Sequence, residues 1–413
     1  MSPLPVSVVV VSRHRPGALL RCLAGLAQSD HPAVEAVVVA CPDGVAAVRG
    51  AGLGAAVKLA GFDAANISAA RNIGLGLAAA DLVGFLDDDA VPEPTWAGRI
   101  AAPFADPLVA AAGGFVRGRN GISFQWRGAE VDALGYDHPF EAGATLVRGG
   151  TAVRALKTQG TCCGFRRAAL LAAGGFDPAL RFFLDEADVN LRLAAAGHLT
   201  ALVPSAQVHH GYAASARRRA DRVPRDLHEI GAGLAVFLRR HAPGADHAAR
   251  IAGFREGARR GLVGHMVAGR IEPGAVAPLL GGFDEGVRAG MARDLPALAP
   301  LAATPPPFLP LPGTGPRPGA LVAGLSRTRL EARARALRAE GHVVTLLHLH
   351  PGLRPHRMRF RPDGIWEQAG GLWGRTERDH AWLRLREVAP ARRAAAEAAR
   401  LAPFRPVERV EVV

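Results

Sequence analysis

Apolar residues near the start of the chain alternate between continuous runs and helical spacing. The run "VSVVVV" at 6–11 is almost entirely β-branched, which is typical of a strand buried on both faces of a parallel sheet. Four leucines then recur at helical spacing behind Pro16: Leu19, Leu20, Leu23 and Leu26. Further apolar runs occupy 34–40 and 81–86, with a helix-like segment between them. This rhythm predicts an α/β fold with a right-handed, mostly parallel sheet flanked by helices.

The pattern changes three times farther along the chain. From about Leu227 the sequence becomes helical and rich in arginine, and the stretch around 301–318 is dense in proline, which is typical of a linker. The last part reads as strand, helix, strand, with the helix ending at Gly341. We therefore expect four parts, which are an α/β domain (1–226), a helical extension (227–300), a proline-rich linker (301–318) and a small Rossmann-like α/β accessory module (319–413).

The charge of the chain is strongly positive but does not predict a nucleic-acid partner. The formal net charge is +13, yet lysine occurs only at Lys58 and Lys157, so arginine supplies almost all of it. Together with abundant Ala, Gly and Pro, this composition indicates the codon bias of a GC-rich genome. The arginines are scattered and lack the interleaved aromatic residues of a nucleic-acid surface.

The cysteines and the apolar segments indicate the compartment. Four cysteines, at positions 22, 41, 162 and 163, show no CxxC spacing, and no secretory leader or stretch of roughly 20 apolar residues is recognisable. We interpret Cys162 and Cys163 as small packing residues. The sequence predicts a reduced, cytoplasmic protein without a structural zinc site or a membrane span.

Three consecutive carboxylates, Asp87, Asp88 and Asp89, follow the apolar run at 81–86. Ligands of open α/β sheets bind outside the carboxyl ends of the strands, which is where this triplet falls. Adjacent carboxylates repel one another when partly buried, and a divalent cation with hard oxygen ligands offsets that repulsion. The alternative is a solvated acidic turn that stabilises the following loop.

The neighbours of the triplet favour the ligand site. The segment "NISAARNIGLGLAAADLVGFLDDDAVPEPTW" at 66–96 resembles the family-2 nucleotide-sugar glycosyltransferases of the GT-A fold. Its Arg-Asn-x-Gly segment, a polar residue before the strand, and a DxD motif followed by proline carry the resemblance, and "SRHRPG" after the first strand adds to it. The matching positions are Arg71, Asn72, Gly74, Asp81, Asp87 and Asp89. The resemblance extends over about 6–222.

The resemblance implies roles for the donor half of a site. Asp89, together with Asp87, is expected to bind the Mn²⁺ or Mg²⁺ that neutralises the diphosphate of the donor, and Asp87 also lies near the ribose. Asp88 belongs to the same donor-binding motif and is expected to matter least of the three. Arg71 is expected to contact the nucleotide, its alternative being a surface helix arginine.

One departure from the family concerns the nucleobase. The family usually has an aspartate directly after the second strand, where this chain has Ala40. Either Asp43 takes over this contact from a shifted turn, or the base is recognised differently. The nucleotide therefore stays open among uridine, thymidine and guanosine diphosphates.

A second cluster of acids resembles the acceptor half of the same family. In "GTCCGFRRAALLAAGGFDPALRFFLDEADVNLRLAAAGH" at 160–198, Glu186 is the favoured catalytic base and Asp185 the second candidate. Asp188, Gly160 and Thr161 are expected on the acceptor side. Alternatively, the acids at 185, 186 and 188 only stabilise the positive end of a helix.

Two further features follow this cluster. In the resembling family a strand ending in Val-x-His supplies an imidazole to the metal or the diphosphate; His209 is the expected ligand here, with His210 as the alternative. Arg217 begins a triple arginine that is expected to lie in a loop closing on the diphosphate. Its alternative is a solvated surface run.

Together these features predict a metal-dependent, inverting glycosyltransferase. It would move a sugar from a nucleoside diphosphate to the hydroxyl of a carbohydrate or lipid-linked acceptor, in polysaccharide or glycolipid assembly. A lipid-linked acceptor would bring the protein to the inner face of a membrane as a peripheral protein. Two alternatives are a sugar nucleotidyltransferase of similar fold and a degenerate transferase retained as a scaffold.

Overall fold

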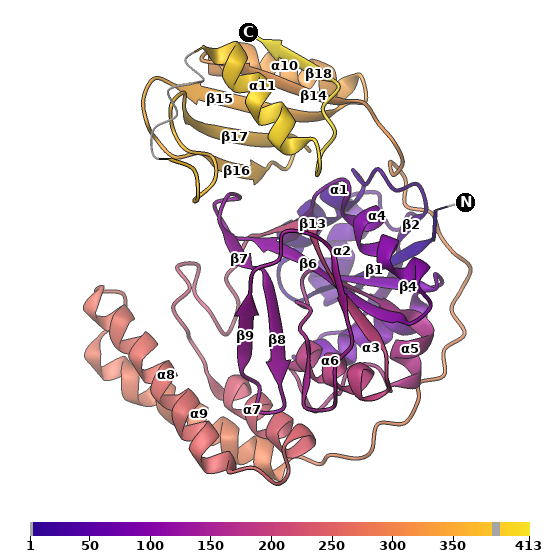
Figure 1. Ribbon diagram of the computed structural model, residues 1–413, viewed down its shortest axis with the longest axis vertical. Coiled ribbons are helices and arrows are strands. Elements are labelled where there is room, and N and C mark those ends of the chain that lie inside the picture. The colour runs from indigo at the N-terminus through magenta and orange to yellow at the C-terminus, as the bar shows by residue number, and fades with distance from the viewer. Residues whose placement is uncertain (1–2, 382–388) are drawn as a thin grey trace.

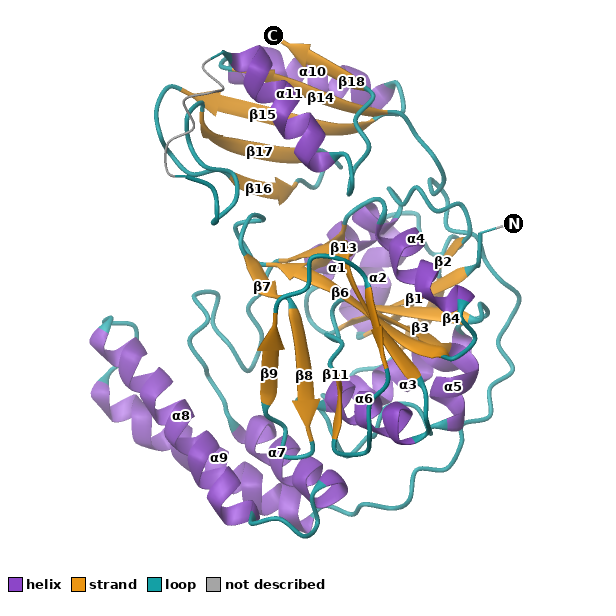
Figure 2. Cartoon of the chain, viewed as in Figure 1, coloured by secondary structure: helices purple, strands orange, loops and turns teal. Residues whose placement is uncertain are grey.

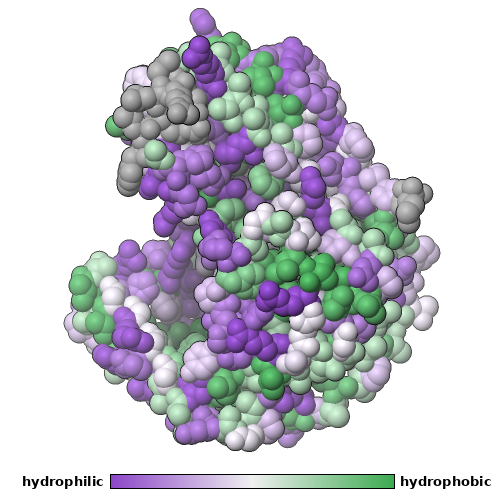
Figure 3. All heavy atoms as spheres, in the orientation of Figure 1, coloured by the Kyte–Doolittle hydropathy of each residue, from purple (hydrophilic) through white to green (hydrophobic). Residues whose placement is uncertain are grey.

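The structure is a computed structural model that describes residues 3–381 and 389–413. Its first part is a large mixed sheet with helices on both faces, and a helical arm and a separate small α/β module follow (Figure 1). The space-filling view shows a deep recess between the arm and the remainder of the molecule (Figure 3). No helix within the two described ranges has the length and apolar composition needed to cross a membrane.

The large sheet contains ten strands. They are β1 (Val6–Ser12), β2 (Val34–Ala40), β3 (Lys58–Gly61), β4 (Leu82–Asp87), β5 (Ala90–Pro92), β6 (Val109–Arg117), β7 (Phe124–Trp126), β10 (Leu146–Arg148), β12 (Cys163–Arg166) and β13 (Leu199–His210). Its helices are α1 (Pro16–Leu26), α2 (Pro42–Gly50), α3 (Ile67–Leu77), α4 (Trp96–Ala101), α5 (Arg167–Ala172) and α6 (Asp185–Ala195), with a 3₁₀ turn at Ala102–Ala105.

The main path of this sheet runs β10-β13-β6-β12-β4-β1-β2-β3. Strands β1 to β4 pair in parallel, as do β6 and β13, whereas β12 lies antiparallel between β4 and β6. The predicted α/β class with a mostly parallel sheet is confirmed. Parallel pairing also places Ser12, Ala40, Gly61 and Asp87 at one edge, because all of them end their strands in the same direction.

Buried side chains cover both faces of β1. Val8 and Val10 pack with the α1 leucines, while Val9 packs on the other face with Phe85 and Phe165. A Cβ atom on Gly74 would lie 2.4 Å from Val9 Cγ1, so the glycine lets α3 lie close against the sheet. This contact fixes the helix that carries Arg71.

The region from 118 to 160 contains short strands. A small sheet of order β11-β8-β9 lies beside the large one, with β8 (Gly128–Asp132), β9 (Asp137–Phe140) and β11 (Arg154–Leu156) (Figure 2). Their sequences lack the apolar alternation of half-buried strands, which is why the pattern alone does not reveal them.

Three helices follow: α7 (His228–His241), α8 (His247–Val267) and α9 (Val276–Ala292), with a 3₁₀ turn at Pro273–Ala275. The helix predicted from Leu227 is therefore present, and Leu234 on α7 is fully buried against the core that includes Phe283 of α9.

The proline-rich segment is extended, but it is bound to the sheet rather than free. The Leu311 amide donates to the Val34 carbonyl at 2.8 Å, and the Leu309 amide donates to the buried carboxylate of Glu35 at 2.9 Å. Lys58 joins them, with Nζ 2.8 Å from Glu35 Oε2 and 3.0 Å from the Pro306 carbonyl. The predicted linker thus covers the strand ends opposite the Asp87 edge.

The C-terminal module is a five-stranded sheet of order β16-β17-β15-β14-β18. Its elements are β14 (Gly319–Gly324), α10 (Arg327–Ala339), β15 (Val343–His350), β16 (Arg357–Phe360), β17 (Trp366–Gly371), α11 (Pro390–Leu401) and β18 (Arg409–Val412). Strand β16 is antiparallel to β17, and the other paired strands of this sheet are parallel. The helices pack on opposite faces, since α10 contacts the core with Val322 and α11 the core with Leu321.

Candidate active site

A cavity of about 630 Å³ lies at the carboxyl edge of the large sheet. Its wall is formed by the segment after β1, the start of α3, the end of β4, the approach to β12, the start of α6 and the segment at 214–227. Eight of the predicted site residues line it: Arg71, Asp87, Asp89, Gly160, Thr161, Asp185, Glu186 and Arg217.

The three consecutive carboxylates point in two different directions. Asp87 is half-buried and Asp89 is buried, and both line the cavity. Asp88 is fully buried and turns to the strand β1 side, where it accepts a hydrogen bond from the Ser12 hydroxyl at 2.8 Å and pairs with Arg15 Nη2 at 2.6 Å. Burial is the main reason that the pKa of Asp88 rises to about 7. Asp88 therefore does not line the cavity, and its carboxylate instead fixes the position of Arg15.

Asp87, Asp89 and His210 form a group that fits a divalent cation. One ligand atom from each lies within 4.8 Å of the others. His210 Nδ1 lies 2.9 Å from Gln125 Oε1, which can only accept, so this nitrogen carries the proton. Its Nε2 faces Asp89 Oδ1 at 3.2 Å and Asp87 Oδ2 at 4.0 Å. A neutral imidazole would direct a lone pair at these carboxylates, so the arrangement calls for a second ring proton or a bound cation.

His209 does not lie with these acids; the side chain beside them is that of His210, the expected alternative. Successive side chains of a strand point to opposite faces, so only one of two adjacent histidines on β13 can face the cavity. His209 is directed away from it, with Nε2 2.7 Å from Glu93 Oε1.

Arg71 joins the two predicted halves of the site. Its guanidinium forms an ion pair with Asp185 through Nη1, and Nη2 lies 3.4 Å from Asp87 Oδ1 and 3.1 Å from the Gly160 carbonyl. Burial opposes ionisation, but the carboxylates of Asp185 and Asp87 outweigh it and raise the pKa of Arg71. The arginine is therefore a buried bridge between two acids rather than a free cation on a helix surface.

The acids at the start of α6 have three different environments. Glu186 is half-buried and lines the cavity, and Asp185 lines it while fully paired to Arg71. Burial, the largest influence, raises the pKa of Asp185. Leu184, directly before them, adopts a left-handed backbone with φ of 64°, which is costly for a leucine and starts the helix abruptly. Leu184 provides no side-chain cap, and all three acids lie in the first turn of α6, where the helix dipole favours negative charge.

Asp188 is not on the acceptor side of the cavity, and that expectation is corrected. It is fully buried, 3.0 Å from Arg192 Nε and 2.9 Å from His241 Nε2 of α7. On a helix, position 188 faces away from 186 because residues two apart do not share a face. Its carboxylate holds α6 against α7.

Gly160 and Thr161 meet the cavity from the approach to β12. A Cβ atom at Gly160 would lie 2.5 Å from Arg71 Nη2, so only glycine leaves the guanidinium in place. Thr161 Oγ1 is buried and has no hydrogen-bond partner among the described residues, which leaves a polar group directed at a ligand position.

Arg217 lies in the segment that covers the cavity. Its guanidinium carbon is 4.3 Å from the centre of the Phe182 ring, and both residues line the cavity. Just before this segment, the Ala213 amide donates a hydrogen bond to Asp89 Oδ2 at 2.6 Å. This contact connects the segment to Asp89.

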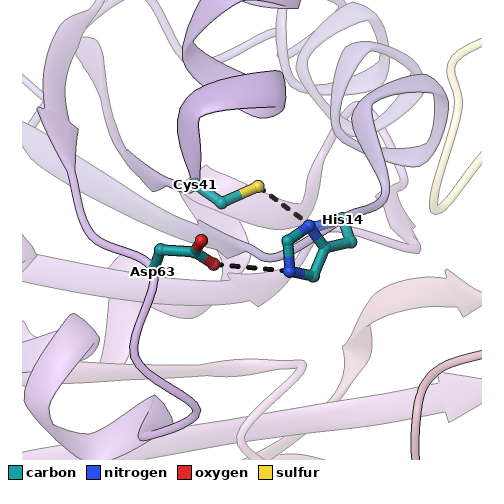
Figure 4. Close-up of side chains that lie close together, drawn as sticks. All are labelled: His14, Cys41 and Asp63. Carbon is teal, nitrogen blue, oxygen red and sulfur yellow. Dashed lines mark hydrogen bonds and ion pairs between the residues drawn. The ribbon is translucent and has the colours of Figure 1, made fainter.

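Asp43 lies outside the cavity, so the structure does not bring it to the other site residues. It is 73% exposed, with Oδ2 3.8 Å from His14 Nδ1. The side chains that gather at this corner are His14, Cys41 and Asp63 (Figure 4), with the His14 amide 3.1 Å from Cys41 Sγ and His14 Nε2 3.4 Å from Asp63 Oδ1.

Several residues that line the cavity are not predicted from the sequence. Arg15 lies between the end of β1 and the start of α1, with Nη1 3.4 Å from Asp89 Oδ2, and the rule that ligands bind at strand ends could have identified it. Trp126 and Phe182 also line the cavity, but nothing in their local spacing indicates a site. Trp126 stacks on His210, with ring centres 6.1 Å apart.

Comparisons with known proteins give one family and several distant structures. The family model described as "Glycosyltransferase like family 2" matches residues 3–225. A search of curated proteins returned no match.

Three solved structures illustrate the distant similarity. A structure of GalNAc-T7 with UDP, GalNAc and Mn²⁺ is 17% identical over 57% of this chain and 48% of its own, with a TM-score of 0.43. TarS from S. aureus is 18% identical over 64% and 44%, with a TM-score of 0.39. The mannosyltransferase PcManGT from Pyrobaculum calidifontis, in complex with GDP-Man and Mn²⁺, is 17% identical over 70% and 87%, with a TM-score of 0.43. The matches thus span about half of the first two chains.

Proposed function

This chain belongs to glycosyltransferase like family 2, and from that membership we propose that it is a metal-dependent, inverting glycosyltransferase. It transfers a sugar from a nucleoside diphosphate to an acceptor hydroxyl. The observation that carries the proposal is that a group able to hold a cation, Asp87, Asp89 and His210, and the carboxylate of Glu186 line one cavity.

Asp87, Asp89 and His210 would hold the cation. When bound, a divalent cation neutralises the charge that develops on the departing diphosphate. Two carboxylates and an imidazole suit Mn²⁺ better than Mg²⁺, because Mg²⁺ prefers oxygen ligands. Gln125 fixes the ring of His210 so that Nε2 points at the cation position.

Glu186 serves as the general base. Its carboxylate takes the proton of the acceptor hydroxyl while that oxygen forms a bond to the anomeric carbon, and the bond from that carbon to the diphosphate oxygen breaks on the opposite face. Asp185, the second candidate, is bound by Arg71, whereas Glu186 lines the cavity without an ion pair to that arginine, which favours Glu186 as the base.

The buried pair of Arg71 and Asp185 keeps the two halves of the site at a fixed separation. Because Arg71 also contacts Asp87, a movement of the cation side is transmitted to the base side. Precise mutual placement of base and donor is a large part of the rate enhancement in such a displacement.

Cationic side chains surround the position of the diphosphate. Arg15 lies beside Asp89, and Arg217 and Arg218 extend from the covering segment into the cavity wall. Guanidinium groups match phosphate oxygens in pairs, so these residues would bind the donor and close the covering segment over it. Asp63 and His14 would contact the nucleobase in place of the expected Asp43.

The wider setting belongs to the same proposal. Residues 1–226 form the catalytic domain, 227–300 a helical extension, 301–318 a bound connecting segment and 319–413 an accessory module. The acceptor is a carbohydrate or a lipid-linked saccharide in polysaccharide or glycolipid assembly. The protein acts in the cytoplasm, with peripheral contact to the inner face of the membrane if the acceptor is lipid-linked, and sedimentation with anionic liposomes tests that contact.

A donor panel tests the function. We expect one of a set of UDP, GDP and dTDP sugars to release its nucleoside diphosphate in the presence of Mn²⁺, and EDTA to stop the release. Consumption of a nucleoside triphosphate and a sugar 1-phosphate instead would identify a nucleotidyltransferase. Binding of a nucleotide sugar without turnover, with any saccharide acceptor offered, would identify a scaffold and refute the proposal.

A further inference from the structure

The C-terminal module contacts the strand that carries His210. In Figure 1 the module lies over the end of the large sheet near β13 and α1. His209 and His210 are adjacent on β13, with His210 toward the acids of the cavity and His209 toward the module. The two neighbouring side chains therefore connect the cavity to the module through a single peptide unit.

A buried ion pair forms the centre of this contact. Arg405 of the module binds both carboxylate oxygens of Glu93, with Nη2 2.9 Å from Oε1 and Nε 3.0 Å from Oε2. His209 Nε2 lies 2.7 Å from the same Oε1. Arg405 is 1% exposed and Glu93 2%. Burial opposes ionisation of Glu93, but Arg405 and His209 outweigh it and lower the pKa of the carboxyl.

Contacts within the module fix the position of Arg405. Its guanidinium carbon lies 3.8 Å from the centre of the Trp366 ring, and Nη1 donates to Thr345 Oγ1 at 2.9 Å. Next to it, the Phe404 carbonyl accepts a hydrogen bond from the Thr95 amide at 3.2 Å. Arg405 therefore cannot move independently of the module.

Glu93 and His209 lie next to the residues proposed to bind the cation, because Asp89 and Glu93 flank β5 and His209 precedes His210 on β13. Strand β5 starts one residue after Asp89, and it pairs with β13 so that Val91 lies opposite His209 and Ala90 opposite His210. Glu93 directly follows this short strand, and its carboxylate contacts His209 of β13. A three-residue strand has little stability of its own, so the buried ion pair contributes much of what holds it in register.

We infer that Arg405 is a positioning residue for the cation site, acting through Glu93 and His209 on the separation of Asp89 and His210. The module is thus a structural part of the active site rather than an independent attachment. The inference rests on the proposed function in one respect, since it assumes that Asp87, Asp89 and His210 bind a cation.

The test measures Mn²⁺ binding to the full chain without donor, by electron paramagnetic resonance of free Mn²⁺. We expect Arg405→Met to raise the dissociation constant about tenfold or more, the size typical of lost supporting contacts around metal ligands. Arg405→Lys keeps the charge but loses the two-pronged guanidinium group. We expect its Mn²⁺ dissociation constant to lie between those of the wild type and Arg405→Met. Hydrogen exchange at the amides of 208–210 should quicken in the Met variant.

Gln28→Ala is the matched control. Gln28 also joins the two parts, with Nε2 donating to the Gly364 carbonyl at 2.6 Å and Oε1 accepting from Trp366 Nε1 at 3.2 Å, but these two hydrogen bonds do not involve Glu93, His209 or Arg405. We expect it to lower the thermal midpoint while leaving Mn²⁺ affinity unchanged.

The outcomes separate the inference from the proposed function. If the wild type binds Mn²⁺ and folded Arg405→Met binds it with the same affinity, the inference is overturned and the proposed function stands. Equal weakening in Gln28→Ala also overturns it, because loose docking alone would then explain the effect. No Mn²⁺ binding in the wild type overturns both. If Arg405→Met fails to fold, Glu93→Gln/Arg405→Met removes both buried charges and must show the same weakening.

Discussion

Arg71→Met tests whether one buried cation holds the two halves of the site together. Methionine keeps the length of the side chain and removes its charge and its donors. The arginine is 4% exposed, as is Asp185, while Asp87 is 28% exposed. Nearly all of the effect should therefore come from Asp185.

The magnitude follows from the burial of the pair. Leaving a buried carboxylate without its cation costs about 3–5 kcal/mol of unfolding free energy. The contact with half-exposed Asp87 adds roughly 1 kcal/mol at most, because water screens it. Removing Arg71 also raises the pKa of Asp185 further, since burial already raises it and the opposing charge is gone. Protonation relieves the unpaired charge, so the loss should shrink as the pH falls.

Urea unfolding followed by tryptophan fluorescence measures the effect at pH 8 and pH 5. Arg71→Met/Asp185→Asn is the matched control, and we expect it to recover most of the lost stability because no buried charge remains. A loss below about 1 kcal/mol at pH 8, or the same loss at both pH values, would refute the reasoning. Donor turnover should fall in both variants.

Three further results are expected. His210→Gln should raise the Mn²⁺ dissociation constant at least tenfold in a calorimetric titration, and an unchanged constant would remove His210 from the cation site. Gly160→Ala should displace the Arg71 guanidinium, which its Cβ atom would approach to 2.5 Å, and lower turnover and thermal midpoint together; activity equal to wild type would show that the loop simply shifts. Burial, followed by the charge of Arg393, lowers the pKa of His356 from 6.5 to about 4, so stability is fully present above pH 6.5 and is lost as the pH falls toward 4, by about 3 kcal/mol. If the free energy of unfolding depends equally on pH in the wild type and in His356→Gln over this range, this expectation is contradicted.

The sequence predicted the main sheet because its signal is local. Continuous apolar runs and helical leucine spacing are properties of neighbouring residues, and they place Asp87 and Glu186 correctly at element ends. The short strands at 124–156 and the bound proline-rich segment depend on contacts with distant partners such as Glu35, which no local pattern records.

The site residues that the sequence predicted correctly are likewise those that belong to local motifs. Asp87, Asp89 and Glu186 belong to motifs, and they line the cavity. The choice between His209 and His210 depends on which face of β13 points at the cavity, and the bulge between 203 and 207 makes that face hard to count from the sequence. Asp188 was misplaced because a motif does not show which side of α6 packs against α7.

The role of Arg71 could not be predicted from its motif. Its partners Asp185 and Gly160 are 114 and 89 residues away, and their meeting is a consequence of β12 inserting antiparallel between β4 and β6. Arg405 lies still farther away, 312 residues from Glu93.

The most direct test of the account separates donor binding from transfer with Glu186→Gln. The substitution keeps the size of the side chain but removes the base, and Asp87, Asp89 and His210 are unchanged. With the donor identified from the panel, isothermal titration in Mn²⁺ and a single-turnover transfer assay are run on both proteins. We predict an unchanged donor dissociation constant and a transfer rate lowered by about 10²-fold or more. Transfer at the wild-type rate by Glu186→Gln would contradict the account.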